Sequence, residues 1–331
     1  PRRYLLALGE TIAGDGSHIF EQSTATDVKH GEPCVVEADG GSVRATDVIV
    51  ATHLPFEDSG LFFAKAHPHR SYAVAAPIDL GAAPDGMFIN SGLPTRSVRT
   101  IRDDERVLVQ TGGEGHKPGT EDDTSARYKV LEDFLAEHWP AAGQVEYRWS
   151  TQDYMSFDRV PYIGKLGRRS DHVYVATGFN GWGMTNGTVA GILLCDAIRG
   201  KPNPWAEVYD STRLPQLGAG RRLVKENANV GLRWLGDRLP RRARSVAELA
   251  AGEGGVVSIG GERAAVYKED DGTLVSLSPV CTHLGCIVGW NTAEETWDCP
   301  CHGSRFDRHG RVIQGPAVQN LPQKNVDPAS R

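Results

Sequence analysis

The sequence has no apolar stretch long enough to cross a lipid bilayer, which takes about 18 consecutive apolar residues in a helix. We therefore expect a soluble, cytoplasmic protein without a membrane span. An excess of positive charge is also missing, since 36 Lys and Arg stand against 42 Asp and Glu, a net charge of -6 over 331 residues. A nucleic acid would be repelled by this charge, so we expect none among the partners.

Three further features are scarce or absent. The Gly-x-Gly-x-x-Gly fingerprint that opens many dinucleotide-binding folds occurs nowhere in the chain. No compact His-x-x-x-His set with a downstream Asp indicates a mononuclear iron site. Only six cysteines occur, and four of them lie in two short blocks near the C-terminus. The other two, Cys34 and Cys195, are expected to be core residues because buried thiols behave as small hydrophobes.

The two cysteine blocks contain most of the chemical information in the chain. Residues 281–286 read CTHLGC, and residues 299–304 read CPCHGS. Two interpretations fit these ligand types: a 2Fe-2S cluster with Cys on one iron and His on the other, and a structural zinc site with two Cys and two His. A structural zinc site does not require a Cys-x-His block followed by the sequence CPCHGS, so we favour the iron–sulfur cluster.

Both blocks resemble the ligand loops of the Rieske family of 2Fe-2S proteins. In such a cluster the His-bound iron is electron-poor, which suits one-electron transfer. The resemblance implies one iron held by Cys281 and Cys299, the other iron held by His283 and His302, and a disulfide between Cys286 and Cys301. Rieske subunits of ring-hydroxylating oxygenases resemble a version without the two disulfide cysteines, so that class is disfavoured.

Neighbouring residues extend the Rieske resemblance. Ser304 resembles the hydroxyl that hydrogen-bonds a bridging sulfide, and residues 315–317 resemble the third loop, which covers the cluster. Phe306 stands where high-potential members of the family have tyrosine. Because a hydrogen bond to a ligand sulfur is then missing, we expect a lower reduction potential.

Hydrophobic periodicity predicts a mixed fold before the cysteine blocks and short strands around them. Helices are expected at residues 2–13, 121–138 and 186–199, with Thr120 as the N-cap of the second helix. Strands are expected at residues 18–27, 34–38, 42–52, 86–91, 97–102, 106–111, 145–149 and 172–177. The C-terminal part is expected to have strands at residues 256–258, 262–267, 274–277 and 296–299.

A glycine-rich turn follows the strand expected at residues 172–177. Glycines there let backbone N–H groups and a helix N-terminus approach a ligand, although an ordinary strand-to-helix connection has the same pattern. Together with residues 158–164, this turn resembles the C-terminal half of the D-amino-acid oxidase-like family of FAD oxidoreductases, which includes glycine and sarcosine oxidases. The resemblance covers about the first 200 residues. Its fingerprint should lie upstream, so we expect the chain to be part of a longer protein.

The FAD oxidoreductase resemblance also implies residue roles. The turn that would lie against the pyrimidine edge of the flavin consists of Gly178, Phe179, Asn180, Gly181, Trp182, Gly183, Met184 and Thr185. Asp158, Pro161 and Gly164 resemble the loop that passes the isoalloxazine ring, and residues 50–52 resemble a strand end under the FAD-binding sheet.

Other candidate residues are less specific. Arg96 or Arg99 could bind a substrate carboxylate in bidentate fashion, but a solvated strand face is the favoured role for both. The scattered histidines are expected to be surface or hydrogen-bonded residues and not catalytic bases; they are His53, His67, His69 and His116.

These patterns predict an α+β region, made of an incomplete FAD-binding part and an antiparallel substrate domain, followed by an all-β Rieske domain. The expected boundaries are residues 1–54 and 145–201 for the FAD-binding part, 55–144 for the substrate domain, 202–244 for a connecting helix or linker, and 245–331 for the Rieske domain. Expected cofactors are FAD and a 2Fe-2S cluster.

The function expected from both resemblances is FAD-dependent oxidation of a C–N bond in an amine or amino acid, with single electrons passing through the cluster. Its partners would be a small-molecule substrate and an unidentified redox partner. The alternative is a non-catalytic electron carrier or redox sensor on an oxidase-like scaffold.

Overall fold

The computed structural model describes residues 1–103, 106–121, 123–213 and 245–325. The chain divides into two compact units, and each combines separate segments of the sequence. The first unit comprises Pro1–Ala66 and Tyr154–Leu223, and the second comprises His67–Asp153 and Val224–Arg331. Most of the connecting helix expected at residues 202–244 lies outside the described residues.

The first unit is built around a short mixed sheet. β11 (Val173–Thr177) is its central strand, parallel to β4 (Val48–Val50) and antiparallel to β10 (Tyr162–Lys165). α4 (Gly183–Ile198) packs on one face through Ala190, Leu193 and Leu194. All five residues of β11 are buried, as expected for a continuous apolar strand covered on both faces.

Smaller elements complete the first unit. They are α1 (Arg2–Ile12), α2 (Phe62–Lys65), α5 (Ala206–Tyr209), the short 3-10 helix η1 (Asp58–Gly60) and an antiparallel meander of β1 (Ala25–Lys29), β2 (Cys34–Ala38) and β3 (Gly41–Ala45). The single strand expected at residues 42–52 is wrong, because the chain turns at Asp47 and continues as β4 in the other sheet. Asp47 and Glu32 both hydrogen-bond His172, and the bond to Asp47 contributes most to raising the pKa of this imidazole.

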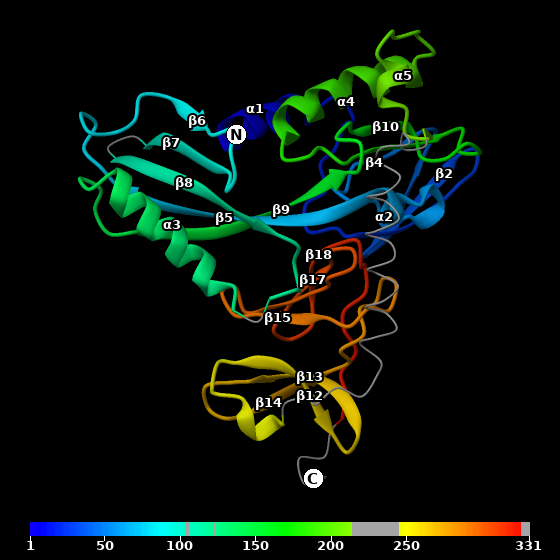
Figure 1. Ribbon diagram of the computed structural model, residues 1–331. Helices are drawn as coiled ribbons and strands as arrows, with labels where there is room; N and C mark the ends of the chain where they lie inside the picture. The colour runs from blue at the N-terminus through cyan, green and yellow to red at the C-terminus, as the bar shows by residue number, and fades with distance from the viewer. Residues whose placement is uncertain (104–105, 122, 214–244, 326–331) are drawn as a thin grey trace. The chain divides into compact units, whose positions relative to one another are not determined.

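The second unit contains a five-stranded antiparallel sheet in the order β6-β7-β8-β5-β9. The strands are β5 (Ala66–Pro77), β6 (Met87–Ile89), β7 (Arg96–Asp103), β8 (Arg106–His116) and β9 (Tyr147–Ser156). α3 (Ser125–His138) lies along one face of this sheet (Figure 1) and buries Tyr128, Leu131 and Leu135 against it. β5 has no counterpart among the expected strands. β9 adds a strand that lies beyond residue 144, the expected end of the substrate domain.

The start of α3 differs from the expected one. The helix begins at Ser125 with Thr124 as the N-cap, and not near residue 121 with Thr120 as the cap. The Thr124 hydroxyl donates to the Asn291 side chain at 2.6 Å and accepts from the Ala293 amide at 3.1 Å. A contact with residues far along the chain therefore determines where the helix begins.

The remainder of the second unit is all-β, as expected. One sheet consists of β12 (Gly254–Ile259), β13 (Glu262–Lys268) and β14 (Leu274–Leu277), preceded by the 3-10 helix η2 (Val246–Glu248). A four-stranded sheet follows, made of β15 (Gly289–Asn291), β16 (Thr296–Asp298), β17 (Arg305–Asp307) and β18 (Val312–Gln314). The core of this part is formed around Trp297 and Phe306, which pair across β16 and β17 and are fully buried.

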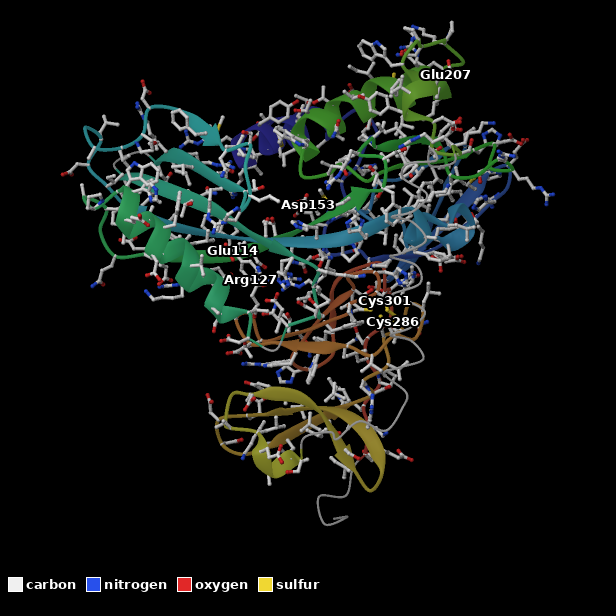
Figure 2. The ribbon with its side chains drawn as sticks, in the orientation of Figure 1. Glu114, Arg127, Asp153, Glu207, Cys286 and Cys301 are labelled. Carbon is white, nitrogen blue, oxygen red and sulfur yellow. A yellow bond between two sulfur atoms is a disulfide. The ribbon has the colours of Figure 1, made fainter. Side chains whose placement is uncertain are left out.

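Two expectations about single residues are wrong. Cys34 is buried, but Cys195 is exposed, because it lies on the face of α4 that does not pack on the sheet. Arg96 is not on a solvated strand face either: it is 9% exposed and forms an ion pair with Glu114, which also contacts Arg127 (Figure 2). His116 is hydrogen-bonded, as expected, to the Tyr72 hydroxyl at 3.0 Å.

Candidate functional site

The two cysteine blocks form two loops with the same backbone geometry. In the first, the Cys281 amide donates to the Cys286 carbonyl at 2.8 Å, and the Gly285 amide donates to the Cys281 carbonyl at 3.0 Å. In the second, the Cys299 amide donates to the Ser304 carbonyl at 2.8 Å, and the Gly303 amide donates to the Cys299 carbonyl at 3.0 Å.

Gly285 and Gly303 have φ angles of 76° and 77°, which glycine adopts without steric cost. Cys281 and Cys299 therefore hold equivalent positions in two matching loops.

A disulfide joins Cys286 to Cys301 and ties the two loops together (Figure 2). The group of cysteine sulfurs within 4.8 Å of one another contains both of these residues and Cys299. Because two members of that group are bonded to each other, they are not free to bind a metal. The thiols left for a metal at this position are Cys281 and Cys299, which are free and buried.

The two free thiols contact each other, and burial affects the protonation of one of the two imidazoles. A hydrogen bond with Cys299 lowers the pKa of Cys281 to about 7, and the same contact raises the pKa of Cys299 well above its usual value. Burial lowers the pKa of His302 to about 3, so its imidazole is neutral at physiological pH. The rings of His283 and His302 lie 5.0 Å apart at 90°. The two loops therefore meet at two points, one between the thiols of Cys281 and Cys299 and one between the imidazoles of His283 and His302.

Three predicted neighbours also lie at this junction. The Ser304 hydroxyl, fully buried, accepts a hydrogen bond from the Ala317 amide at 3.0 Å, so the third loop contacts the second. Phe306 is buried in the adjoining core. The hydroxyl of Thr282 donates to the Gln319 carbonyl at 2.6 Å, which joins the first loop to the same covering segment.

The sheet of the second unit contacts the second loop through residues that the sequence analysis missed. Gln152 on β9 donates to the Gly303 carbonyl at 2.8 Å, and Arg70 on β5 forms an ion pair with Asp298 at 3.2 Å. Asp298 immediately precedes Cys299. The signal for these contacts in the sequence is the acidic Asp298 directly before Cys299, since a buried charge requires a buried partner.

In the first unit, the glycine-rich turn connects β11 to α4 as expected. Gly178, Asn180 and Gly181 have positive φ angles of 72°, 56° and 82°. The Asn180 side chain holds the turn, because it donates to the Gly178 carbonyl at 2.7 Å and accepts from the Ser156 amide at 2.9 Å. Trp182 and Met184 are 61% and 43% exposed, so this end of α4 is accessible to a ligand.

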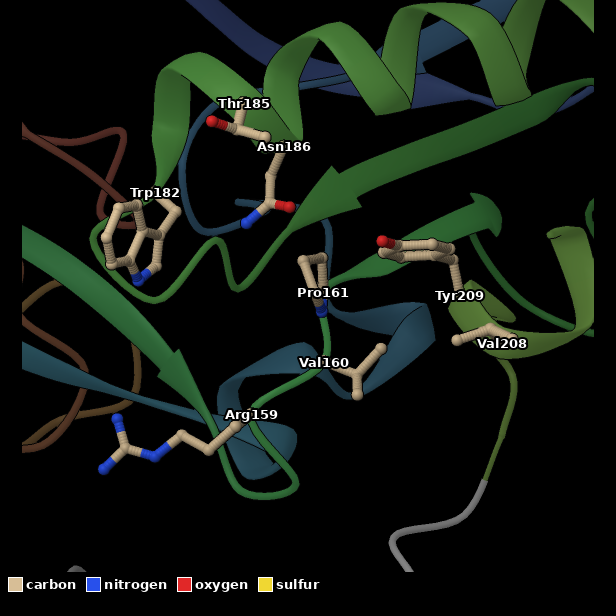
Figure 3. Close-up of a pocket in the computed structure, with 8 residues that line it drawn as sticks. All are labelled: Arg159, Val160, Pro161, Trp182, Thr185, Asn186, Val208 and Tyr209. Carbon is tan, nitrogen blue, oxygen red and sulfur yellow. The ribbon is translucent and has the colours of Figure 1, made fainter.

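A pocket of about 320 Å³ opens beside the turn (Figure 3). It brings both predicted flavin-facing segments together, and its lining consists of Arg159, Val160, Pro161, Trp182, Thr185, Asn186, Val208 and Tyr209. Next to it, Asp158 forms a bidentate pair with Arg213, at 2.8 and 2.9 Å. The Arg213 guanidinium lies 4.0 Å from the centre of the Tyr162 ring. These contacts stabilise the loop that leads to Pro161.

Comparison with known families explains the combination of a sheet-based unit and two cysteine loops. A model described as FAD dependent oxidoreductase matches residues 1–197, and one described as Rieske [2Fe-2S] domain matches residues 241–325. The chain belongs to the FAD-dependent oxidoreductase family. It carries a Rieske domain at its C-terminal end, so both resemblances in the sequence and the predicted fold class are confirmed.

Individual relatives agree with this assignment. The putative Rieske 2Fe-2S iron-sulfur protein YhfW of Bacillus subtilis (strain 168) is 36% identical over 329 residues, covering 99% of this chain and 64% of the relative. The chain thus spans less than two thirds of that protein. The cytochrome b6-f complex iron-sulfur subunit 1 of Cyanophora paradoxa is 47% identical over 68 residues, covering 20% of this chain and 28% of the subunit.

Among solved structures, NikD, described as an unusual amino acid oxidase, is similar to this FAD-dependent oxidoreductase with a TM-score of 0.51 and 14% identity. The match covers 63% of this chain and 58% of NikD, and it shows a shared fold.

Both cofactors implied by the family fit the residues of this oxidoreductase. Two cysteine sulfurs and two imidazoles are the donor set of a Rieske cluster, which supplies one-electron transfer at its His-bound iron. For FAD, the turn before α4 offers the unsatisfied first-turn amides of a 16-residue helix, next to an open pocket. In the described part of the chain, no helix is both long and apolar enough to span a membrane.

Proposed function

We propose that this chain belongs to an enzyme that oxidises a C–N bond of an amine or amino acid with FAD and passes the electrons singly through a Rieske cluster. The observation that carries the proposal is the convergence of Cys281, Cys299, His283 and His302 in a chain with an amine-oxidase-like fold. A C–N substrate is supported by the fold shared with NikD, an amino acid oxidase. The domain boundaries expected from the sequence are part of this proposal.

In this proposal, FAD would supply hydride acceptance from the substrate and release of single electrons. The turn from Gly178 to Thr185 would hold the pyrimidine edge of the flavin, where the N-terminus of α4 would stabilise negative charge. Asn180 holds that turn in position through its bonds to Gly178 and Ser156. Pro161 contributes the opposite wall of the pocket.

Cys281 and Cys299 would hold one iron of the cluster through sulfur, and His283 and His302 would hold the other through their imidazoles. The Cys286–Cys301 disulfide keeps the two loops together. Ser304 places a hydroxyl in the buried space between the loops. An unidentified redox partner exchanges electrons with the cluster.

The metal assignment is tested by iron and sulfide analysis of the full-length protein after native purification. His283→Ala and His302→Ala should each lose the cluster, whereas the exposed His309→Ala in the same domain should retain it. Unchanged iron content in both ligand variants would contradict the assignment. Zinc in place of iron and sulfide would support a structural metal site instead.

The enzymatic part is tested by anaerobic mixing of the flavin- and cluster-loaded protein with a panel of amines and amino acids. We expect a substrate to bleach the flavin first and then to produce the EPR signal of a reduced cluster. A protein that is purified without flavin, or whose flavin no amine or amino acid reduces, would refute the proposed oxidation.

A further inference from the structure

Arg70 on β5 is a fully buried cation whose anionic partners lie in the Rieske domain. Its guanidinium lies 3.2 Å from an Asp298 carboxylate oxygen and 3.3 Å from one of Glu294. On the sheet side it donates to the Ser150 hydroxyl at 3.1 Å and to the side-chain oxygen Oε1 of Gln152 at 3.3 Å. A buried charge is tolerated only when it is paired and hydrogen-bonded, so Arg70 and its partners must keep these relative positions.

The two acids are themselves held by the Rieske domain and by the sheet. Asp298 is 2% exposed and accepts from the Asn291 amide group at 3.0 Å and from Arg305 at 3.2 Å. Glu294 accepts from the Ser150 backbone amide at 2.9 Å and from the Tyr128 hydroxyl at 3.1 Å. The network therefore connects β5, β9 and α3 with Glu294 in the turn between β15 and β16 and with Asp298 at the end of β16.

Gln152 extends this network to the ligand loop. Its side-chain oxygen Oε1 accepts from Arg70, and its side-chain nitrogen Nε2 donates to the backbone carbonyl of Gly303, the residue after the ligand His302. One side chain thus connects the buried cation to the loop that holds the cluster.

Two glycines show how closely the backbones approach. A Cβ atom on Gly303 would lie 2.5 Å from the Gln152 side chain and 2.7 Å from Pro68. A Cβ atom on Gly119, in the segment after β8, would lie 2.7 Å from the Asp298 carbonyl oxygen. No real Cβ atom tolerates such distances, so the loop is seated directly on the sheet.

The two histidines differ in exposure as a result. His302 is 4% exposed, whereas His283 is partly exposed and its neighbour Leu284 is 39% exposed. One imidazole is buried by the chain itself, and the other is partly exposed.

We propose that Arg70 and Gln152 are positioning residues that lock the loop Cys299–Ser304 onto the antiparallel sheet, so that the cluster works at a fixed place and does not swing on a mobile domain. This inference rests on the proposed function, because it presumes a cluster between the loops. The covered ligand His302 is then the side of the cluster that faces the chain's own sheet. His283 is the side open to an external redox partner.

The first test measures mobility in the full-length holoprotein, once its iron content has been established. A nitroxide is attached to α3 by Lys129→Cys in a Cys195→Ser background, and the distance to the reduced cluster is measured by pulsed EPR. A single narrow distance distribution is expected. A broad or bimodal distribution would overturn the inference while leaving the proposed function intact, whereas missing iron would count against the proposed function.

The second test removes the connection without removing the charge. Gln152→Leu deletes the bond to Gly303, so the amides of Cys299 and Gly303 should exchange with deuterium about five- to tenfold faster, as expected for one lost hydrogen bond. The midpoint potential and the EPR g-values should change as well, because the ligand loop relaxes.

Thr151→Val is the matched control for Gln152→Leu. Thr151 is the preceding residue of the same strand, its side chain is exposed, and it contacts only the Ser71 hydroxyl among the bonds described, at 3.4 Å. Its exchange rates, potential and g-values should equal those of the wild type. If Gln152→Leu matches Thr151→Val in all three measurements, Gln152 has no positioning role. Complete loss of the cluster in Gln152→Leu alone would support the role, provided that the variant retains the wild-type far-UV spectrum.

Discussion

Replacement of Arg70 by Met is the most informative perturbation of stability. It preserves much of the aliphatic volume but removes one of the two cations that pair with Asp298 and Glu294, whose side chains are 2% and 19% exposed, so that both carboxylates must share Arg305. Breaking a buried ion pair by removing one partner costs about 3 to 5 kcal/mol. Because a domain is typically stable by about 5 to 15 kcal/mol, we expect a large fall in the unfolding midpoint of the second unit.

The assay is urea unfolding of the holoprotein, followed both by far-UV circular dichroism and by the visible absorbance of the cluster. Arg106→Met is the matched control, since it makes the same change on the same sheet in an exposed pair with Glu146. Exposed pairs contribute little to stability, so the control should unfold almost as the wild type does. Adding Asp298→Asn to Arg70→Met should recover part of the loss, because only one buried carboxylate then remains to pair with Arg305. If Arg70→Met unfolds no earlier than Arg106→Met, the reasoning about buried charge is refuted.

Three other predictions concern single positions. Gly119→Ala should destabilise the holoprotein by more than Gly272→Ala, because both have positive φ angles, 64° and 87°, but only Gly119 abuts other atoms; equal losses, of about 1 to 2 kcal/mol from the backbone alone, would contradict the close approach. Cys286→Ser removes a cross-link over 15 residues and should cost about 3 kcal/mol and speed iron loss to a chelator; unchanged chelation kinetics would argue against a clamping role. For His172, the pKa is higher in the folded state than in the unfolded state. Its contribution to folding stability is therefore complete below the unfolded-state pKa and is lost as pH rises through the folded-state pKa. His172→Gln should therefore lower the urea midpoint more at pH 5.5 than at pH 8.5. An equal effect at both pH values would show that the charged imidazole does not contribute to stability.

Local pattern was sufficient for elements whose determinants are close in sequence. β2 at Cys34–Ala38 and β14 at Leu274–Leu277 match the expected ranges, because alternation and flanking turns specify such strands. β5 was missed because Pro68 and several polar residues interrupt its pattern, and pairing with β8 stabilises it nonetheless. The sequence predicts a surface position for Arg96, because nothing near it in the chain indicates Glu114 as its partner.

The sequence by itself determined the chemistry of the cluster loops. The thiols, the imidazoles and the glycines at positive φ all lie within two short blocks, so the donor set and the turn geometry are encoded locally. Only the tertiary structure decided which histidine is covered and what holds the second loop. Arg70 and Gln152 reach Asp298 and Gly303 from strands far away in the chain, and the cost of burying a charge makes that contact specific once the strands have packed.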